Sequence, residues 1–387
     1  MPLNYLNLQN QIQSMADASA SRRQELAERL NQCEELLHAQ SHNLIRLQEK
    51  VEKAAAKDKN LRCAVPVSEA LDAHFPAPVS PQSCTILSAD GSQITPNPHE
   101  AIFYGVVNVG VFYMQPGSGL APTTATTTEL IYEEGDPNEN ERITEELINL
   151  RRDVTERQVL VDYAKILPAP LITLTDGPLE LYHEPGPKNP FKHYLDDYLA
   201  ALDKLSLLNI ITAGYVDRPR AALLINLLEL AAKPENEVLK TAPLFSGLSD
   251  LAIMRDLLQP SERSAIFGLQ SSSGNDYEGR KALHFFYLNV GSSDHPAVAR
   301  VEIPLWVMEV PDSIDLLHSV LLDQARQSGL HPYPYALIRA HETAVVKMDE
   351  HEALTGLIQN ELLRRGVPLQ TDSEKLANKK VGTRTRY

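Results

Sequence analysis

The chain has 387 residues, enough for one large domain or two of ordinary size, with 43% hydrophobic and 22% charged residues as in other globular proteins. The best candidate for a membrane span, residues 221–232, is short and contains Glu229, and the N-terminus lacks the pattern of a secretory signal. The three cysteines, Cys33, Cys63 and Cys84, have no metal-binding spacing and are typical of reduced thiols. We therefore expect a cytoplasmic protein that does not enter the membrane.

The formal net charge is −15. Because non-specific affinity for nucleic acid comes from neutralising phosphates, this charge argues against tight binding to DNA by the chain alone. An enzyme acting on nucleic acid would need a local basic rim, and clustered acidic metal ligands would themselves add negative charge.

Residues 1–64 are predicted to be helical and coiled-coil-like. Apolar residues follow heptad spacing, broken at Gln40. The seam consists of Leu26, Leu30, Cys33, Leu37, Leu44, Leu47, Val51 and Ala54. Two interpretations stay open: an amphipathic helix lying on its own domain, or a coiled-coil hairpin or dimer element. A Pro-rich linker is expected over 65–83, a single mixed α/β domain over 84–366, and a basic flexible tail over 367–387.

The middle of the chain alternates apolar strand patterns with helical ones. Strands are predicted at 84–89, 101–114, 126–132, 171–175 and 209–216, and helices at 141–167, 191–208 and 219–232. Three consecutive strands indicate an antiparallel meander, and the later strand–helix–strand steps indicate parallel crossovers. This order matches an α/β ribonuclease-H-like mixed sheet flanked by helices.

In such a sheet the first and fourth strands lie side by side. Here each is expected to end in Asp-Gly, at Asp90 and Asp176. A lone Asp-Gly is usually only a turn, but two at these positions favour a metal site for phosphodiester hydrolysis, which needs hard oxygen ligands. A third carboxylate is expected from the helix over 141–167, where Glu156 competes with Asp153 and Glu146.

Four segments resemble the NurA nucleases: ILSADGSQI (86–94), LITLTDGPL (171–179), DLAIMRDLLQPSERSAIF (250–267) and YPYALIRAHETA (333–344). The resemblance spans about Cys84 to Val346. It implies a ribonuclease-H-like fold and a deoxyribonuclease that uses Mn²⁺, with Mg²⁺ as the alternative. It also implies single-strand endonuclease and 5′–3′ exonuclease activity in DNA end resection and double-strand break repair, by a homodimer working with a HerA-type hexameric ATPase.

By this resemblance, Asp90, Glu156, Asp176 and His341 are expected to bind the metal, and Tyr333 joins them as an active-site residue. Pro178 departs from the pattern, because a small polar residue would be less surprising after the second Asp-Gly.

The residues around His341 agree with this assignment. Pro334 suits the first turn of a helix, which places Tyr333 at the helix entrance and His341 about two turns further on. A neutral histidine there could bind a metal or pass a proton to the leaving group. Without the resemblance, a core histidine would be the simpler interpretation.

Arg218 and Arg220, after the fifth strand, are candidate DNA-binding residues, although arginines there often pair with nearby acids. Two other classes of function stay open. One is a non-catalytic ribonuclease-H-like scaffold in a DNA-processing complex, and the other is a coiled-coil adaptor, which leaves the two Asp-Gly pairs unexplained.

Overall fold

The computed structural model describes residues 4–79, 83–97, 102–132, 143–181, 190–234 and 242–367. The helices are α1 (Tyr5–Gln40), α2 (Leu44–Lys57), α3 (Glu145–Ala164), α4 (Pro190–Leu207), α5 (Leu223–Ala232), α6 (Asp250–Leu257), α7 (Leu305–Glu309), α8 (Ser313–Gln327), α9 (Tyr335–Ala344) and α10 (Met348–Arg364). The strands are β1 (Cys63–Pro66), β2 (His74–Phe75), β3 (Thr85–Ile94), β4 (Gly105–Met114), β5 (Thr123–Ile131), β6 (Leu171–Asp176), β7 (Ile211–Val216), β8 (Arg263–Ser264), β9 (Phe267–Gln270), β10 (Leu283–Asn289) and β11 (Val298–Pro304).

The chain forms two compact units. Unit 1 comprises Met1–Ser80, Gly177–Glu180 and Gly214–Pro332, and unit 2 comprises Pro81–Asp176, Leu181–Ala213 and Tyr333–Tyr387. Strand β7 contributes its first three residues to unit 2 and its last three to unit 1. The residues expected to form one domain over 84–366 are therefore divided between the two units.

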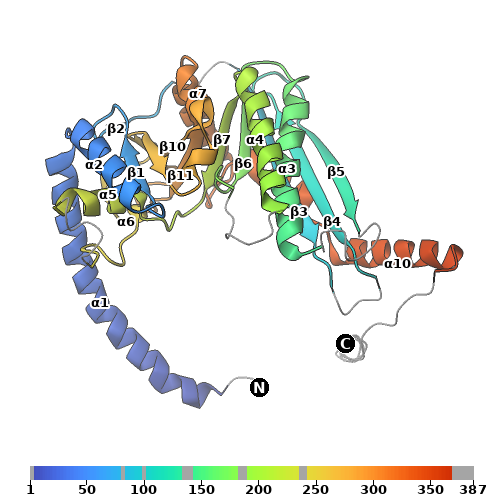
Figure 1. The fold of residues 1–387 in the computed structure, drawn as a ribbon, viewed down its shortest axis with the longest axis horizontal. Coiled ribbons are helices and arrows are strands. Elements are labelled where there is room, and N and C mark those ends of the chain that lie inside the picture. The colour runs from blue at the N-terminus through green and yellow to red at the C-terminus, as the bar shows by residue number, and fades with distance from the viewer. Residues whose placement is uncertain are drawn as a thin grey trace. The chain divides into compact units, whose positions relative to one another are not determined.

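Unit 2 contains the predicted ribonuclease-H-like arrangement (Figure 1). Its strands follow the order β7-β6-β3-β4-β5, with β3–β4 and β4–β5 antiparallel and β3–β6 parallel. The meander, the parallel crossover through α3 and the placement of β6 beside β3 confirm the predicted fold class. The predicted elements agree with the observed ones to within a few residues.

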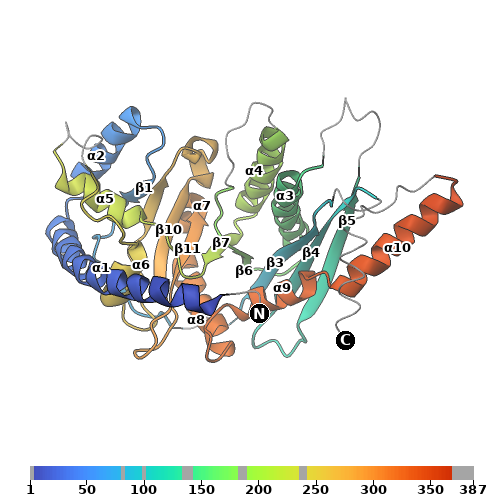
Figure 2. The same cartoon turned by 90° about the horizontal axis from the view of Figure 1, so that it is seen from below.

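Helices cover both faces of the unit 2 sheet. Figure 2 shows α3 and α4 on one face and α9 on the other. Helix α3 begins where Thr144 accepts a hydrogen bond from the backbone N–H of Leu147 (3.1 Å), and Glu145 and Glu146 occupy its first turn, as helix starts favour. It ends before Pro168, which cannot continue a helix.

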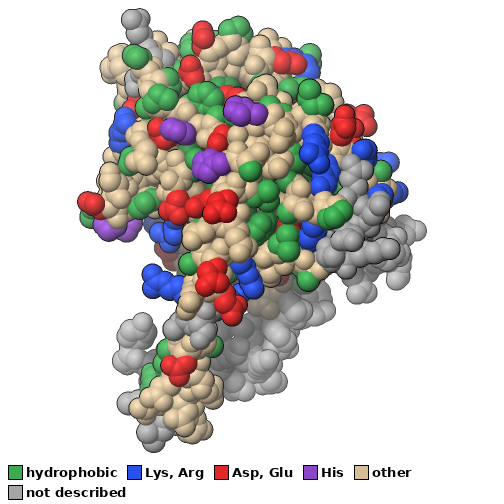
Figure 3. Space-filling view, turned by 90° about the vertical axis from the view of Figure 1, so that its left-hand side faces the viewer, with side chains coloured by type: hydrophobic (Ala, Val, Ile, Leu, Met, Phe, Trp, Pro, Cys, Tyr) green, Lys and Arg blue, Asp and Glu red, His purple; other side chains and the backbone are tan. Residues whose placement is uncertain are grey.

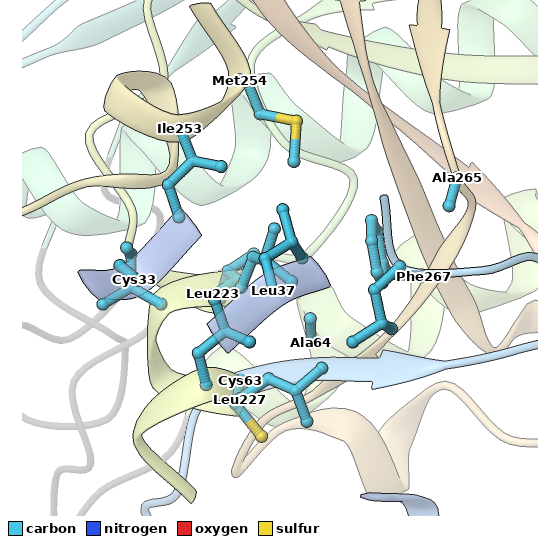
Figure 4. Close-up of a cluster of buried hydrophobic side chains, with 14 of the residues drawn as sticks. Cys33, Leu37, Cys63, Ala64, Leu223, Leu227, Ile253, Met254, Ala265 and Phe267 are labelled. Atoms are coloured by element: carbon cyan, nitrogen blue, oxygen red, sulfur yellow. The ribbon is translucent and has the colours of Figure 1, made fainter. Parts of the chain in front are cut away.

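Unit 1 is built on an antiparallel sheet in the order β1-β9-β10-β11-β7, with β2 and β8 pairing beside β10. Figure 4 shows its core, where Cys33 and Leu37 of α1 meet Leu223 and Leu227 of α5, and Phe267 of β9. The predicted heptad seam breaks where α1 ends, at Gln40, and its members on α2, such as Leu47 and Val51, are buried in this same core. Of the two interpretations of the seam, the buried residues match the helix lying on its own domain.

The segment over 65–83, expected to be a linker, contains the end of β1 and all of β2, and Leu71 within it is fully buried. Pro66 closes β1, a position at the end of an edge strand that a residue without an N–H tolerates. Pairing of β1 with β9 is what brings 214–332 into the same unit as the N-terminal helices.

Several surface histidines of unit 1 pair with acids. His38 lies 2.8 Å from Asp72, and His74 lies 3.0 Å from Glu262. Figure 3 shows histidine and acidic side chains close together on one face.

Within the described ranges, no helix is long and apolar enough to cross a membrane. The three cysteines are buried free thiols. Of the tail expected over 367–387, all but the first residue lies outside the described residues.

Candidate active site

Asp90 and Asp176 are neighbours at the point where two parallel strands part. The β3–β6 pairing ends at Ala89–Thr175, and the next residue on each strand is the aspartate. Adjacent strands lie about 4.8 Å apart, so the two carboxylates start from neighbouring backbone positions. The structure thus brings together the two residues that the sequence predicted as a pair.

The two aspartates differ in local structure. Asp176 is the last residue of β6, and Gly177 after it has φ +83°, the left-handed conformation that glycine adopts easily, as predicted for a strand ending in a turn. The same prediction is wrong for Asp90. Strand β3 continues to Ile94 because β4 keeps pairing with it beyond β6, and Asp90 is paired with Gly110.

Gly91 therefore has a different role from the predicted turn. A Cβ built on Gly91 would lie 2.6 Å from Glu156 Oε1 and 2.4 Å from Arg152 Cγ. The missing side chain allows α3 to approach β3 closely, which places the helix carboxylate beside the residue that follows Asp90.

The opposite face of β3 carries α9. Alternate strand residues point to one face, and here Ser88, Asp90 and Ser92 all contact α9. Ser88 Oγ donates to the carbonyl of Ala336 (2.7 Å), and Ser92 Oγ donates to that of Ala344. Between them, His341 Nδ1 lies 2.7 Å from Asp90 Oδ2. The two serines fix the helix along the strand so that His341 reaches Asp90.

Strand β4 supplies two further contacts that the sequence analysis missed. A Cβ on Gly110 would lie 2.4 Å from the backbone N of Ala344 and 2.5 Å from the carbonyl oxygen of Ala340, so α9 packs directly on the backbone of the residue paired with Asp90. Buried Asn108 donates to the Ala344 carbonyl (2.7 Å) and accepts from Thr128 (2.6 Å). The sequence feature that could have indicated these contacts is the presence of an Asn and a Gly within an otherwise apolar strand.

Tyr333 lies immediately before Pro334, the N-cap of α9, and its hydroxyl donates to Asp176 Oδ1 at 2.8 Å. The two C-terminal candidates thus contact different aspartates: His341 contacts Asp90, and Tyr333 contacts Asp176.

Glu156 is the most buried of the three helix candidates, with 9% of its surface exposed. Burial, together with the charges of Asp153 and Asp90, raises its pKa to about 8, against the lowering effect of the nearby Arg152 and Arg157. Arg152 pairs with Asp153 at 2.8 Å and with Glu156 at 3.6 Å, and Glu146 is exposed. Only Glu156 of the three lies against Gly91.

Arg157, which the sequence analysis also missed, is buried behind these residues. Its Nη2 donates to Thr175 (2.6 Å), the residue before Asp176, and its Nε donates to Tyr198 of α4 (3.0 Å). Nη1 is buried without a hydrogen-bond partner among the described residues. This side chain ties the helix that carries Glu156 to the strand that carries Asp176.

The two candidate DNA-binding residues belong to unit 1, whereas the five candidate active-site residues belong to unit 2. Arg218 is exposed in a left-handed conformation (φ +46°), 4.0 Å from Asp217, and Arg220 is exposed.

The donor set suits a hard divalent cation. Asp90, Asp176 and Glu156 supply carboxylate oxygens and His341 an imidazole, the ligands that Mn²⁺ and Mg²⁺ accept. Within the described part of the chain, no three His, Cys, Asp or Glu side chains are already grouped as around a metal ion. Asp90 and Asp176 instead contact His341 and Tyr333, respectively.

The sheet order and the acidic residues at the β3–β6 junction define a ribonuclease-H-like domain with a candidate carboxylate site. The model of the NurA domain family matches residues 84–346, more than half of the chain. The chain belongs to this family, and it is a nuclease by that membership.

Similar solved structures include the NurA nuclease from Sulfolobus solfataricus, at 12% identity and a TM-score of 0.48, covering 76% of this chain and 88% of that one. The catalytic domain of human Endonuclease V is similar at 13% identity and a TM-score of 0.31, covering 84% of this chain and 99% of that one. No curated protein matched the chain.

Proposed function

We propose that this protein is a metal-dependent DNA nuclease that hydrolyses phosphodiester bonds with Mn²⁺, or Mg²⁺ as the alternative, held by Asp90, Glu156 and Asp176. The observation that carries the proposal is the end of the β3–β6 pairing at Ala89–Thr175, which sets Asp90 beside Asp176. The close approach of α3 at Gly91 places Glu156 beside the residue that follows Asp90, near enough for the charge of Asp90 to raise the pKa of Glu156. Family membership supplies the reaction class.

The chain's own residues would orient the substrate and handle protons. If Asp90 accepts the Nδ1–H of His341, the other ring nitrogen, Nε2, can contact the cation or the substrate. Within the described residues, Nε2 makes no hydrogen bond. From there His341 either completes the cation's ligands or passes a proton to the leaving oxygen. Tyr333 orients Asp176. A divalent cation bound here would polarise the phosphate and lower the pKa of a water.

The test is cleavage of labelled single- and double-stranded DNA with Mn²⁺, Mg²⁺ or EDTA. Asp90→Asn and Asp176→Asn should abolish the metal-dependent cleavage and weaken Mn²⁺ binding. Asp162→Asn is the matched control, because Asp162 is exposed on α3 and pairs with nearby Lys165 (2.8 Å). Cleavage by either active-site variant at the wild-type rate would contradict the assignment. The lengths of the labelled products separate endonucleolytic from 5′–3′ exonucleolytic cutting.

A second candidate function is a non-catalytic scaffold in a DNA-processing complex. The lack of three grouped metal-binding side chains among the described residues favours it. Titration with Mn²⁺ separates the two: a scaffold should bind no ion at Asp90 and Asp176, whereas a nuclease should bind Mn²⁺ more weakly once either is replaced.

We further propose that the protein works in DNA end resection as a homodimer that a HerA-type hexameric ATPase supplies with DNA. The support is the family membership and the net charge of −15, which disfavours unaided binding to a polyanion. Resection of linear duplex DNA near physiological salt should require the ATPase and ATP. The isolated chain should lose activity steeply as salt rises, and this salt dependence should be much weaker when the ATPase and ATP are present. Processive ATP-independent digestion by the isolated chain, or a monomeric mass at micromolar concentration, would overturn this.

A further inference from the structure

The two elements that carry Asp90 and His341 both lead into one cavity. Strand β3 continues from Asp90 to Gln93 and Ile94, and α9 continues from His341 to Val346 and the start of α10. A cavity of about 490 Å³ lies there, within unit 2. Its lining residues are Gln93, Ile94, Thr95, Pro96, Asn97, Val346, Lys347, Met348 and His351.

The cavity lies close to the candidate active site. Gln93 lies three positions after Asp90 on β3, which corresponds to about 10 Å of strand. A B-form strand of DNA advances about 3.4 Å per phosphate, so a strand cut at Asp90 would reach the cavity within a few nucleotides. The volume is within the range of about 300–1,000 Å³ typical of small-molecule sites.

Part of the lining is apolar and packed against the interior. Ile94 is buried in a small cluster with Tyr104 and Val106, and Val346 packs against it. The ring of His351 lies edge-on to Tyr104, with the ring centroids 6.3 Å apart. These side chains form a surface against which the flat face of a nucleobase can pack.

The described lining also includes polar residues but no acid. None of the described residues that line the cavity is Asp or Glu, although the chain has a net charge of −15. Lys347 supplies a cation, and neighbouring Glu350 accepts the backbone N–H of Lys347 at 2.8 Å. Nε2 of His351 is buried with no hydrogen-bond partner among the described residues. Gln93 is held in place by hydrogen bonds with Asn149 (2.9 Å) and Arg152 (3.0 Å).

We propose that this cavity binds one nucleotide of the DNA strand a few nucleotides from the cleaved phosphodiester, with its base on Ile94 and Val346 and its phosphate on Lys347. An apolar wall, a cation and several neutral hydrogen-bonding groups match a base joined to a phosphate. The inference rests on the proposed nuclease function for its substrate class. It adds a subsite that holds the strand without taking part in the chemistry.

The experiment is binding of a 5′-phosphorylated oligothymidine to the full chain in EDTA, where no metal-dependent cleavage interferes. Lys347→Gln should weaken binding several-fold and reduce the slope of log K against log salt by about 0.7, the value for one contact with a single-strand phosphate. His351→Phe keeps a ring against Tyr104 and removes the unpartnered nitrogen, and it should weaken binding without that change in slope. Lys165→Gln, which changes an exposed lysine at the C-cap of α3 outside the cavity, should behave as the wild type.

With Mn²⁺ present, Lys347→Gln should raise KM and leave kcat nearly unchanged, as expected for binding that is equal in ground and transition states. Wild-type affinity and salt slope in Lys347→Gln would overturn the subsite, as would the same loss in Lys165→Gln. If the chain binds the oligonucleotide in a Lys347-dependent way but cuts no DNA, the subsite is supported and only the nuclease proposal is contradicted.

Discussion

His341 Nδ1 lies 2.7 Å from Asp90 Oδ2, although the two residues are 251 positions apart in the chain. The His341 side chain is two-thirds exposed, whereas only 16% of the Asp90 side chain is exposed. A carboxylate that fixes one ring nitrogen leaves the other directed outward, as an active-site histidine requires.

His341→Asn should keep a donor toward Asp90 and lose the outer nitrogen. We expect kcat to fall about 100-fold or more, as for loss of a general acid or a metal ligand. Measuring Mn²⁺ affinity distinguishes a metal ligand from a general acid. In the variant, both kcat and Mn²⁺ affinity should fall if His341 is a ligand, whereas only kcat should fall if it is a general acid. The matched control is His193→Asn on α4, where an exposed histidine also faces a carboxylate (3.5 Å to Asp197). Similar activity in the two variants would remove His341 from the site.

Gly110→Ala tests whether close packing of α9 on β4 positions His341. The added Cβ meets backbone atoms of Ala340 and Ala344 that cannot rotate away, so α9 must shift. We expect a loss of about 1–3 kcal/mol in unfolding free energy and a larger proportional loss of kcat. Gly356→Ala in α10 is the control, because open space surrounds Gly356 and alanine favours a helix. Full activity in Gly110→Ala, measured on protein shown to be folded, would contradict this role.

Glu156→Gln tests the third carboxylate through stability as well as activity. The pKa of Glu156 is raised to about 8, so between pH 4.5 and 8 the folded chain keeps a proton that the unfolded chain releases. Wild-type stability should therefore fall as pH rises through this window, and the stability advantage of Glu156→Gln in EDTA should grow up to about pH 8 and then stay constant.

If Glu156 is a ligand, Mn²⁺ should stabilise the wild type more than the variant. Asp153→Asn and Glu146→Gln are the rival variants, and both should cost much less activity than Glu156→Gln. If all three variants lose activity equally and only mildly, the third metal ligand is not Glu156, Asp153 or Glu146.

His318 predicts a loss of stability in acid that does not involve the active site. This fully buried histidine of α8 lies 2.9 Å from the carbonyl of Ser261, and burial lowers its pKa to about 4. Between pH 6.5 and 4 the unfolded chain binds a proton that the folded chain does not, so this contribution to stability falls on acidification. We expect about 2 kcal/mol of it to be lost between pH 7 and 5.

Urea unfolding at the two pH values measures this loss, and His318→Gln, which keeps an N–H donor, should reduce it. An unchanged pH dependence in the variant would show that other groups cause the acid sensitivity.

The sequence by itself determined the order of elements and much of the local structure. Period-two and period-3.6 patterns placed the strands and helices between residues 84 and 232 within a few residues, except at the end of β3, and Asp176-Gly177 indicated the turn that follows β6. These features depend on backbone preferences and on burial of one face, which adjacent residues encode. The four NurA-like segments identified the family before any geometry was known, and the family model confirms it.

Only the tertiary structure decided which residues meet. Nothing near Asp90 in the chain shows that β4 continues to pair beside it, so the sequence predicted a turn where β3 runs on. Gly91 and Gly110 are explained by α3 and α9, which approach β3 and β4 from opposite faces. The burial of Arg157 against Thr175 and the division of 84–366 between two units likewise depend on contacts between distant segments. Such contacts are set by packing of whole elements, which local patterns do not encode.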